Sequence, residues 1–162
     1  MRILVDADAC PRIVKDILYK TSKRLNIELI FVANQYLRVP KSDLISCIAV
    51  SEGADEADDK IVEMMNSEDL VISADIPLAD RVIKKNGVVL DPRGTFFTEE
   101  NIGDRLATRN LMEDFRSTTG LQTGGVGAYG NKEKQEFANQ LDKFLTKRLK
   151  DLATKYTKKG MH

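Results

Sequence analysis

Histidine and cysteine are scarce in this chain of 162 residues. Its only histidine, His162, is the last residue, and its only thiols are those of Cys10 and Cys47. A catalytic Ser-His-Asp or Cys-His arrangement therefore has no histidine unless the C-terminus folds back. Three such residues also cannot fill a four-ligand zinc site. Any chemistry must therefore depend mainly on carboxylates, hydroxyls, amides and basic side chains.

Long hydrophobic runs are absent as well. No stretch approaches the roughly 18 consecutive apolar residues of a transmembrane helix, so we expect no membrane association. The N-terminal segment becomes acidic at Asp6, which is too early for a signal peptide. Two cysteines without a spacing pattern do not indicate a disulfide framework, and a reducing cytoplasm is the expected location.

Composition and length indicate one globular domain. Hydrophobic residues make up 42% of the chain and charged residues 31%, as in ordinary globular proteins. The 25 basic and 25 acidic residues are unevenly spread: residues 1–91 hold 12 basic and 16 acidic groups, and residues 92–162 hold 13 and 9. This asymmetry permits either a cation site beside an anion-binding surface or two solvated surfaces of unequal composition.

Apolar runs alternate with helical patterns as far as residue 92. We expect strands at 2–6, 28–33, 47–50, 70–74 and 87–90, helices at 11–25, 54–66 and 77–85, and a turn or short helix at 40–46. Strands separated by helices favour right-handed crossovers and a sheet covered on both faces. The prediction is therefore an α/β fold of three layers, with about five mostly parallel strands and helices on both faces.

The pattern changes after Pro92. Thr98 fits the N-cap of a helix that extends to about residue 116, with Phe97 and Ile102 as a hydrophobic staple. Residues 117–131 contain five of the ten glycines and are predicted to be a loop, and a last helix is expected at 132–152. The prediction is a single domain over 1–162, with an α/β core at 1–92 and a helical part with a glycine-rich loop at 93–162.

Carboxylates gather where this fold would place a binding site. Ligands of an open parallel sheet bind outside the carboxyl ends of its strands, where the strand order reverses. Asp6 and Asp8 end the first predicted strand, Asp75 ends the fourth, and Asp80 follows about one helical turn later. Residues 52–59 add five carboxylates and no basic group.

Like charges at this density repel one another unless a cation lies among them. Carboxylates without histidine or thiolate partners are hard oxygen ligands, which favour Mg²⁺ or Mn²⁺. The predicted cofactor is therefore Mg²⁺ or Mn²⁺, and the predicted ligands are Asp6, Asp8, Asp58, Asp59, Asp75 and Asp80. For any one of these carboxylates, a purely structural role at a helix N-terminus is the alternative.

Several ordered segments resemble the signature segments of the YaiI/YqxD family of bacterial proteins, which is related to the PIN-like nucleases. These segments are residues 5–11 (VDADACP), 53–61 (GADEADDKI), 73–79 (SADIPLA), 92–94 (PRG) and 123–125 (TGG), followed by the closing helix. The resemblance implies a PIN-like fold in which Asp6, Asp58 and Asp75 are the catalytic acids. Asp58 is preferred to Asp59 because it lies three residues before Ile61, as in the Asp-x-x-Ile pattern of relatives.

The leading hypothesis is a metal-dependent nuclease or related phosphodiesterase that acts on RNA or DNA. Arg93, Arg105 and Arg109 are the predicted binding residues for the anionic substrate. The usual PIN acid of the second crossover has no match here, and Asp8 and Asp55 are additional, so the number of metal ions stays open. The Gly-x-Gly-x-x-Gly match at 125–130 does not predict a dinucleotide site, because no strand flanks it.

Two other classes remain open. One is a non-catalytic module of the same fold that binds nucleic acid or protein and keeps a metal-stabilised acidic pocket. The other is a haloacid-dehalogenase-type phosphatase. Asp6 and Asp8 resemble the paired aspartates of that superfamily, and Asp75 and Asp80 resemble its late pair of acids. Against the phosphatase, Cys10 stands where Thr or Val is usual, and the lysine before the late acids and the cap region are missing. The oligomeric state cannot be inferred from the sequence.

Overall fold

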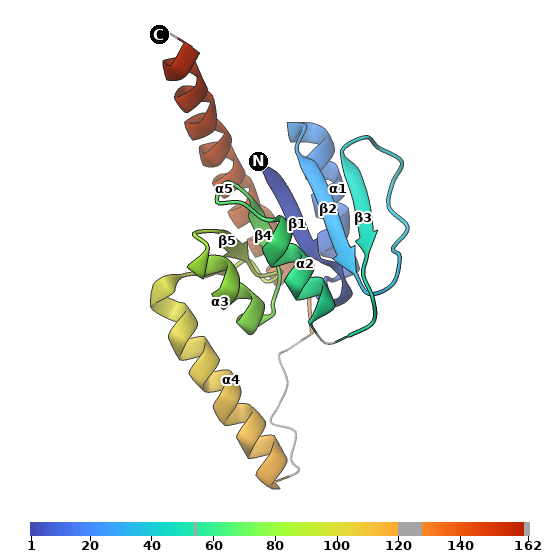
Figure 1. Ribbon diagram of the computed structural model, residues 1–162, viewed down its shortest axis with the longest axis vertical. Helices are drawn as coiled ribbons and strands as arrows, with labels where there is room; N and C mark the ends of the chain where they lie inside the picture. The colour runs from blue at the N-terminus through green and yellow to red at the C-terminus, as the bar shows by residue number, and fades with distance from the viewer. Residues whose placement is uncertain (54, 120–127, 161–162) are drawn as a thin grey trace.

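A computed structural model describes residues 1–53, 55–119 and 128–160 (Figure 1). Its first half consists of β1 (Arg2–Asp6), the 3₁₀ turn η1 (Ala7–Ala9), α1 (Arg12–Leu25), β2 (Glu28–Ala33), β3 (Ile45–Ala49) and α2 (Glu56–Met64). Its second half consists of β4 (Leu70–Ile72), α3 (Ile76–Lys84), β5 (Val88–Leu90), β6 (Phe96–Phe97), α4 (Glu99–Thr119) and α5 (Asn131–Gly160).

The strands form one six-stranded sheet in the order β3-β2-β1-β4-β5-β6. All neighbouring pairs are parallel except β5 and β6, which are antiparallel. The chain runs outward from β1 to β3 and then returns to place β4 on the other side of β1, so the strand order reverses between β1 and β4. The predicted α/β class with a mostly parallel sheet is confirmed, although the sheet has six strands rather than about five.

Helices cover both faces of this sheet and create two apolar cores. Figure 1 shows α2 and α3 in front of the sheet and α1 and α5 behind it. Buried residues of the core on the α1 and α5 side include Val14, Leu18, Phe137, Leu141 and Leu145, and those on the α2 and α3 side include Ala57, Ile61, Leu78, Val82 and Ile102. The apolar stripe of α5 therefore packs on the sheet, as its spacing predicts.

The start of α4 has the predicted capping residue. The backbone N–H of Asn101 donates to Thr98 Oγ1 at 3.1 Å, and the backbone N–H of Thr98 donates to Asn101 Oδ1 at 2.8 Å. This reciprocal pair satisfies two donors at the helix end, with asparagine in the position where glutamate is common.

The turn between β5 and β6 holds the beginning of α5. Gly94 has a φ of +91°, and a Cβ atom at this position would lie 2.7 Å from the backbone of Glu136. The hydroxyl of Tyr129 donates to the carbonyl oxygen of Pro92 at 2.9 Å. Only glycine allows both this conformation and this close approach, so the Pro-Arg-Gly segment anchors the last helix to the carboxyl end of β5.

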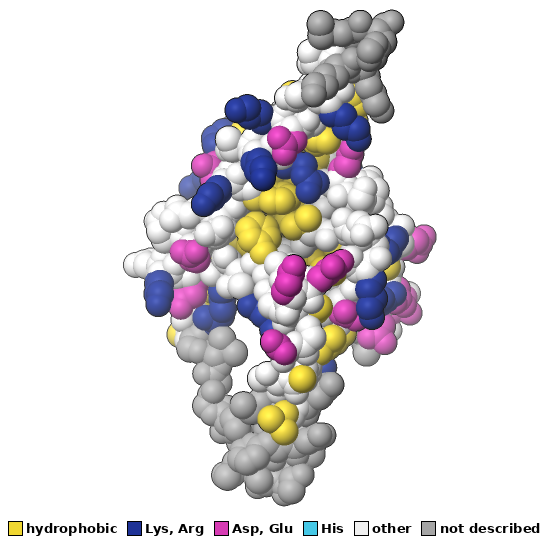
Figure 2. All heavy atoms as spheres, turned by 90° about the vertical axis from the view of Figure 1, so that its left-hand side faces the viewer, with side chains coloured by type: hydrophobic (Ala, Val, Ile, Leu, Met, Phe, Trp, Pro, Cys, Tyr) yellow, Lys and Arg dark blue, Asp and Glu magenta, His cyan; other side chains and the backbone are white. Residues whose placement is uncertain are grey.

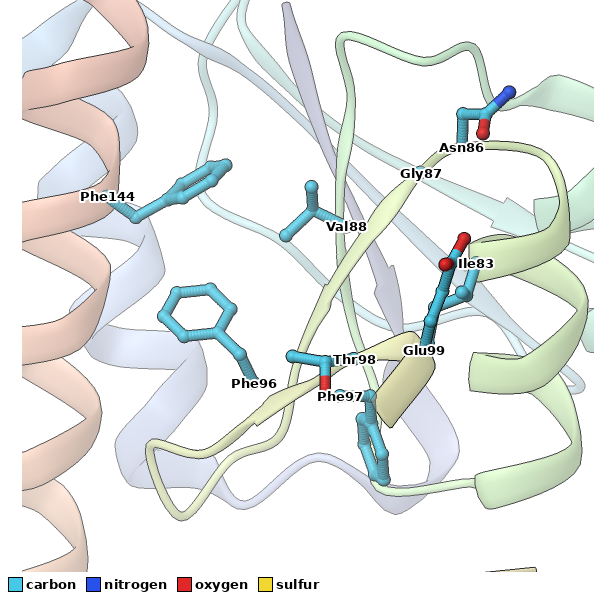
Figure 3. Close-up of a pocket in the computed structure, with 9 residues that line it drawn as sticks. All are labelled: Ile83, Asn86, Gly87, Val88, Phe96, Phe97, Thr98, Glu99 and Phe144. Atoms are coloured by element: carbon cyan, nitrogen blue, oxygen red, sulfur yellow. The ribbon is translucent and has the colours of Figure 1, made fainter. Parts of the chain in front are cut away.

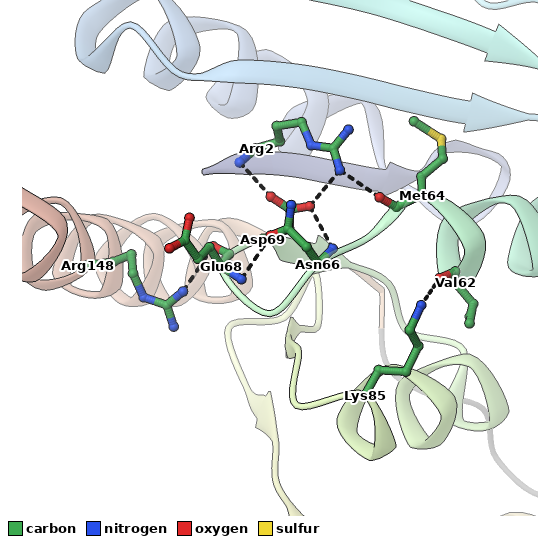
Figure 4. Close-up of polar contacts among 8 residues, drawn as sticks. All are labelled: Arg2, Val62, Met64, Asn66, Glu68, Asp69, Lys85 and Arg148. Atoms are coloured by element: carbon green, nitrogen blue, oxygen red, sulfur yellow. Dashed lines mark hydrogen bonds and ion pairs between the residues drawn. The ribbon is translucent and has the colours of Figure 1, made fainter. Parts of the chain in front are cut away.

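A partly buried ion pair joins the amino ends of β1 and β4 (Figure 4). Asp69 is fully buried, and its two oxygens accept from the backbone N–H and the guanidinium of Arg2, both at 2.9 Å. The backbone N–H of Asn66 also donates to this carboxylate at 3.0 Å, and Arg2 donates to the Met64 carbonyl oxygen. These bonds hold the amino ends of the two central strands in register.

Some predicted elements differ from the structure. The segment predicted at 40–46 as a turn or short helix contains a turn at 43–44, but β3 already begins at Ile45 rather than at residue 47. Strand β6 was not predicted from the sequence. Helix α4 continues to Thr119 and therefore includes residues predicted as loop, while α5 extends beyond the predicted end at residue 152 to Gly160. The TGG segment at 123–125 and the first three residues of the Gly-x-Gly-x-x-Gly match at 125–130 lie outside the described residues. No helix within the described residues is long and apolar enough to cross a membrane.

Candidate functional site

Two of the predicted acids meet at the reversal of the strand order. Asp6 is the last residue of β1 and is 7% exposed, and Asp75 follows β4 as the N-cap of α3. Ser73 lies between them: its hydroxyl donates to Asp6 Oδ2 at 3.0 Å and accepts from the backbone N–H of Asp75 at 3.0 Å. Because a single buried hydroxyl contacts both residues, Asp6 and the Asp75 backbone are close neighbours at this carboxyl edge.

Asp58 brings a third carboxylate to the same place from the first turn of α2. Burial raises its pKa to about 7, and repulsion from Asp75, Asp6 and Asp55 adds to this effect, while Arg81 opposes it. Asp58 accepts no hydrogen bond from the residues that the structure describes. The carboxylates of Asp6 and Asp75 are therefore close enough to Asp58 to disfavour its ionisation, and these three residues together are called the acid cluster below.

The pKa of Asp6 is also raised. Burial is the main cause, and the carboxylates of Asp75 and Asp8 raise it further, while the hydrogen bond from Ser73 lowers it. Asp8 lies in η1 at the rim of the cluster and is exposed; its Oδ2 accepts from the backbone N–H of Asn34 at 3.0 Å. Asp8 is thus near the cluster but is held toward the end of β2.

The structure places two predicted metal ligands in ion pairs instead. Asp59 accepts from Arg81 at 2.8 Å, and Asp80 accepts from Lys84 at 2.8 Å, one helical turn further along α3. Neither Asp59 nor Asp80 is among the charges that shift the pKa of Asp6 or Asp58. Their placement makes them surface partners of basic side chains rather than members of the cluster.

The donor set of the cluster suits a hard cation, but the side chains are not yet arranged around one. Asp75 uses Oδ1 to cap α3 by accepting from the Leu78 N–H at 2.9 Å, and Asp6 uses Oδ2 for Ser73. The second oxygen of each accepts no hydrogen bond from the described residues. Within the described part of the chain, no three acidic, cysteine or histidine side chains form a ready metal-binding group.

Basic side chains lie beside these acids at the end of β5. Asp91 follows β5, and its pKa is raised by burial and lowered by the backbone N–H of Arg93 and by the charges of Arg105 and Arg93. Arg93 also pairs with Glu133 at 3.6 Å, and the guanidinium of Arg105 lies 4.6 Å from the centre of the Phe97 ring. Two of the three predicted substrate-binding arginines therefore surround one carboxylate at the carboxyl edge.

The third arginine shares a hollow with the second. Arg105 and Arg109 of α4 line a hollow of about 380 Å³ together with Ile76, the residue after Asp75. Asp104 and Thr108 complete its lining. An anion bound between these arginines would thus lie next to the residue that begins α3.

Sequence reasoning missed three polar groups at this edge. Ser73 orients Asp6, Asp91 ends the fifth strand, and Asn34 follows β2 with a buried Oδ1 that has no partner among the described residues. The rule that acids after parallel strands converge would have found Asp91. Cys10 is buried next to the cluster, and burial raises the pKa of its thiol to about 12, so it is not a nucleophile at neutral pH.

A wide hollow of the described surface lies away from the acids (Figure 3). This groove of about 480 Å³ runs between Phe144 of α5 and Glu99 of α4, with Val88 and Phe96 on its floor. Figure 2 shows the apolar floor with Lys and Arg side chains above it and Asp and Glu side chains below. It contains no residue of the acid cluster, so its size does not make it the catalytic candidate.

Comparisons with known proteins identify relatives over nearly the whole chain. The model of a family described as "Uncharacterized BCR, YaiI/YqxD family" matches residues 4–147. A "UPF0178 protein" of Maridesulfovibrio salexigens is 53% identical over 149 residues, which cover 92% of this chain and 98% of that protein. Another, of Pseudoalteromonas atlantica, is 54% identical over 148 residues, covering 91% and 100%. A third, of Shewanella halifaxensis, is 50% identical over 147 residues, covering 91% and 97%. No solved structure matches the chain significantly.

Proposed function

The chain belongs to the YaiI/YqxD family, and from the chemistry of its carboxyl edge we propose that it is a metal-dependent phosphodiesterase that cleaves RNA or DNA. The observation that carries this proposal is the meeting of Asp6, Asp58 and Asp75, from three separate elements, at the reversal of the strand order. A crevice at this point is where open α/β sheets bind their ligands.

The chemistry of the cluster supports a divalent cation. Burial and the charges of Asp75 and Asp6 raise the pKa of Asp58, and burial and the charge of Asp75 raise that of Asp6, so the cluster is unfavourable when all three are ionised, and a cation among them would relieve this cost. Asp6 and Asp75 each have one carboxylate oxygen that could coordinate a cation. Rotation of Asp58 about its side-chain bonds would bring a third carboxylate to the same cation. When bound, Mg²⁺ or Mn²⁺ lowers the pKa of a coordinated water and neutralises charge on phosphoryl oxygens.

The other residues of the edge have complementary tasks. Ser73 holds the Asp6 carboxylate in one orientation through its hydroxyl, and the N-cap bond holds Asp75. Arg93, Arg105 and Arg109 supply positive charge on the β5 and α4 side, where the phosphate of a substrate would bind. This combination of a cation site with arginines favours a phosphodiester over a neutral substrate, and the likeness to PIN-like nucleases supports a nucleic acid.

The proposal is tested with a Mn²⁺-dependent panel of oligonucleotides and phosphomonoesters. Wild type, Asp6→Asn and Asp75→Asn are compared with the control Asp142→Asn, which removes an exposed carboxylate paired with Arg24 at 3.0 Å on the far helices. We expect oligonucleotide cleavage by wild type and the control, and loss of cleavage in the two cluster variants. Cleavage that persists in purified Asp6→Asn would refute this function.

The same panel separates the other two classes. A phosphatase of the haloacid-dehalogenase type would release phosphate from monoesters and form an aspartyl-phosphate mimic on Asp6. A binding module would retain oligonucleotides in Mg²⁺ without cutting them, with affinity that falls steeply as salt rises. Either result would replace the proposed function by the alternative it supports.

A further inference from the structure

A basic stripe runs along the outer face of α1, on the sheet edge opposite to the arginines. Lys15, Tyr19 and Lys23 are spaced four residues apart and therefore lie on one face of this helix. Lys20 is adjacent to Tyr19. Eight residues of helix place Lys23 about 12 Å beyond Lys15 along the helix axis.

The far end of this stripe opens into a hollow of about 350 Å³. It lies between α1 and the chain that connects β2 to β3, which Figure 1 shows at the right-hand edge. The lining consists of Tyr19, Lys20, Lys23, Pro40, Lys41, Ser42 and Ile45, and none of these residues is acidic. Asp16 and Asp43 are the acids nearest in sequence, and neither lines the hollow.

The lysines of this surface are not neutralised by the protein. Lys20, Lys23 and Lys41 are exposed, and within the described residues none of them forms a hydrogen bond or an ion pair. A concave surface with charges of one sign concentrates its electrostatic field and attracts the opposite charge. The ring of Tyr19 is held in place by an edge contact with Phe31 at 5.5 Å between ring centres, so an aromatic surface is fixed among the lysines.

The near end of the stripe reaches the acid cluster. The charges of Lys15 and Asp6 both act on the thiol of Cys10, and Tyr19 is also within electrostatic reach of this thiol. Lys15 also lies in the first turn of α1, which is separated from Asp6 at the end of β1 only by η1 and residues 10–11. The stripe thus begins beside the acid cluster and ends in the lysine hollow.

We propose that the α1 stripe and the lysine hollow bind the phosphates of a single-stranded nucleic acid whose reacting phosphodiester lies at the acid cluster. The inference rests on the proposed function for the position of the cleaved bond. The stripe of about 12 Å is long enough to contact successive phosphates of a short single-stranded segment. A fixed aromatic ring in a basic groove is the usual surface for a single strand, because it stacks with any base.

Binding of fluorescein-labelled oligouridylates of 3 and 12 nucleotides, followed by anisotropy in EDTA from 50 to 300 mM salt, tests this inference. The test variant is Lys20→Gln with Lys23→Gln and Lys41→Gln. The matched control is Lys143→Gln with Lys147→Gln and Lys150→Gln, three exposed lysines of α5 with the same change in net charge. Urea unfolding of each variant confirms that it folds.

We expect the test variant to bind the 12-mer about 100-fold more weakly than wild type, at about fivefold per lysine. The slope of log affinity against log salt should fall by about 2, at about 0.7 per phosphate contact. The control should stay within threefold of wild type, and the 3-mer should bind wild type more weakly than the 12-mer does, because it offers fewer phosphates to the stripe and the hollow.

A test variant that binds the 12-mer within threefold of wild type, or a control that weakens binding equally, would overturn the inference. Polyglutamate is added as a competitor. If it displaces the labelled 12-mer at the same concentration as unlabelled oligouridylate, the surface binds an acidic polypeptide and the inference is also overturned. Because binding in EDTA does not require hydrolysis, the two proposals can fail separately. Salt-dependent binding without Mn²⁺-dependent cleavage would refute only the proposed function, and cleavage with unchanged binding by the test variant would refute only the strand path.

Discussion

Replacing Asp58 with asparagine should stabilise the protein at alkaline pH when no divalent cation is present. The side chain lies in the first turn of α2 and faces the carboxylates of Asp75 and Asp6, and its pKa is raised from 3.8 to about 7. Asparagine has nearly the same shape and carries no charge. The substitution therefore removes the cost of burying a charge, which is the main cause of the raised pKa, together with the repulsion from Asp75 and Asp6, and it leaves the packing in place.

The size of this effect follows from the pKa. At 1.36 kcal/mol per pKa unit, a rise from 3.8 to about 7 corresponds to about 4 kcal/mol less free energy of unfolding above pH 7. The side chain is only half-buried, so solvent screens the repulsion, and we expect about 2 kcal/mol. In a chain of this length, such a gain raises the melting temperature by about 4–8 °C.

The sign of the effect depends on pH. The unfolded carboxyl group of Asp58 ionises near pH 4, whereas the folded one stays protonated up to about pH 7. Between these values the folded state binds more protons, so the free energy of unfolding of the wild type falls as the pH rises. The variant lacks this loss, and its advantage should be full at pH 8 and no more than about half of that at pH 4.5.

Urea unfolding of wild type and Asp58→Asn in EDTA at both pH values measures this difference. Asp59→Asn is the control, because it removes the next carboxylate, which is paired with Arg81 at 2.8 Å on the surface, and should cost at most about 1 kcal/mol at either pH. If Asp58→Asn is no more stable than wild type at pH 8, or gains equally at both pH values, the ionised Asp58 carboxylate does not destabilise the folded protein and the reasoning is refuted.

Four further outcomes follow from the contacts described above. Millimolar Mn²⁺ should raise the melting temperature of the wild type, measured by calorimetry, and should not raise that of Asp6→Asn. Ser73→Ala should lower the free energy of unfolding by about 1–3 kcal/mol at pH 8 in urea, because the buried Asp6 carboxylate loses its donor at 3.0 Å. Asp69→Asn should cost about 2 kcal/mol, seen by thermal circular dichroism, because the ion pair between the buried Asp69 carboxylate and the partly exposed Arg2 is lost. Gly94→Ala should cost about 2 kcal/mol or more, seen as a lower urea midpoint, since its φ of +91° and its contact with α5 both exclude a Cβ atom.

The strongly periodic elements of the fold could be predicted from the sequence. The predicted strand at 28–33 has the same bounds as β2, and the predicted helix at 11–25 differs from α1 by one residue. Their apolar patterns are long enough to show a period. Strand β6 has only two residues, Phe96 and Phe97, and exists because they pair with Leu90 and Val89 of β5. Such a pairing is tertiary and leaves no local pattern.

The acid cluster could be located in advance, but not all of its members. The rule for parallel sheets places Asp6 and Asp75 at one edge, and the structure joins them through Ser73. Asp58 and Asp59 are adjacent in sequence, yet successive helical residues point about 100° apart, so only one of them faces the cluster. Asp59 forms an ion pair with Arg81 of α3 because α2 and α3 pack side by side. Composition and residue spacing do not reveal such packing.

The pairing of β1 with β4 makes the acid cluster a late product of folding. Asp6 and Ser73 are 67 positions apart, so a growing chain carries β1, α1 and β2 well before β4 exists. Parallel pairing over such a separation must first close a long loop and is correspondingly slow. Until β4 docks, Asp6 is a single carboxylate with neither Ser73 nor Asp75 beside it. We therefore expect affinity for a cation to arise only with the completed sheet, so that an N-terminal fragment ending before residue 70 would bind none, however well its first strands pair.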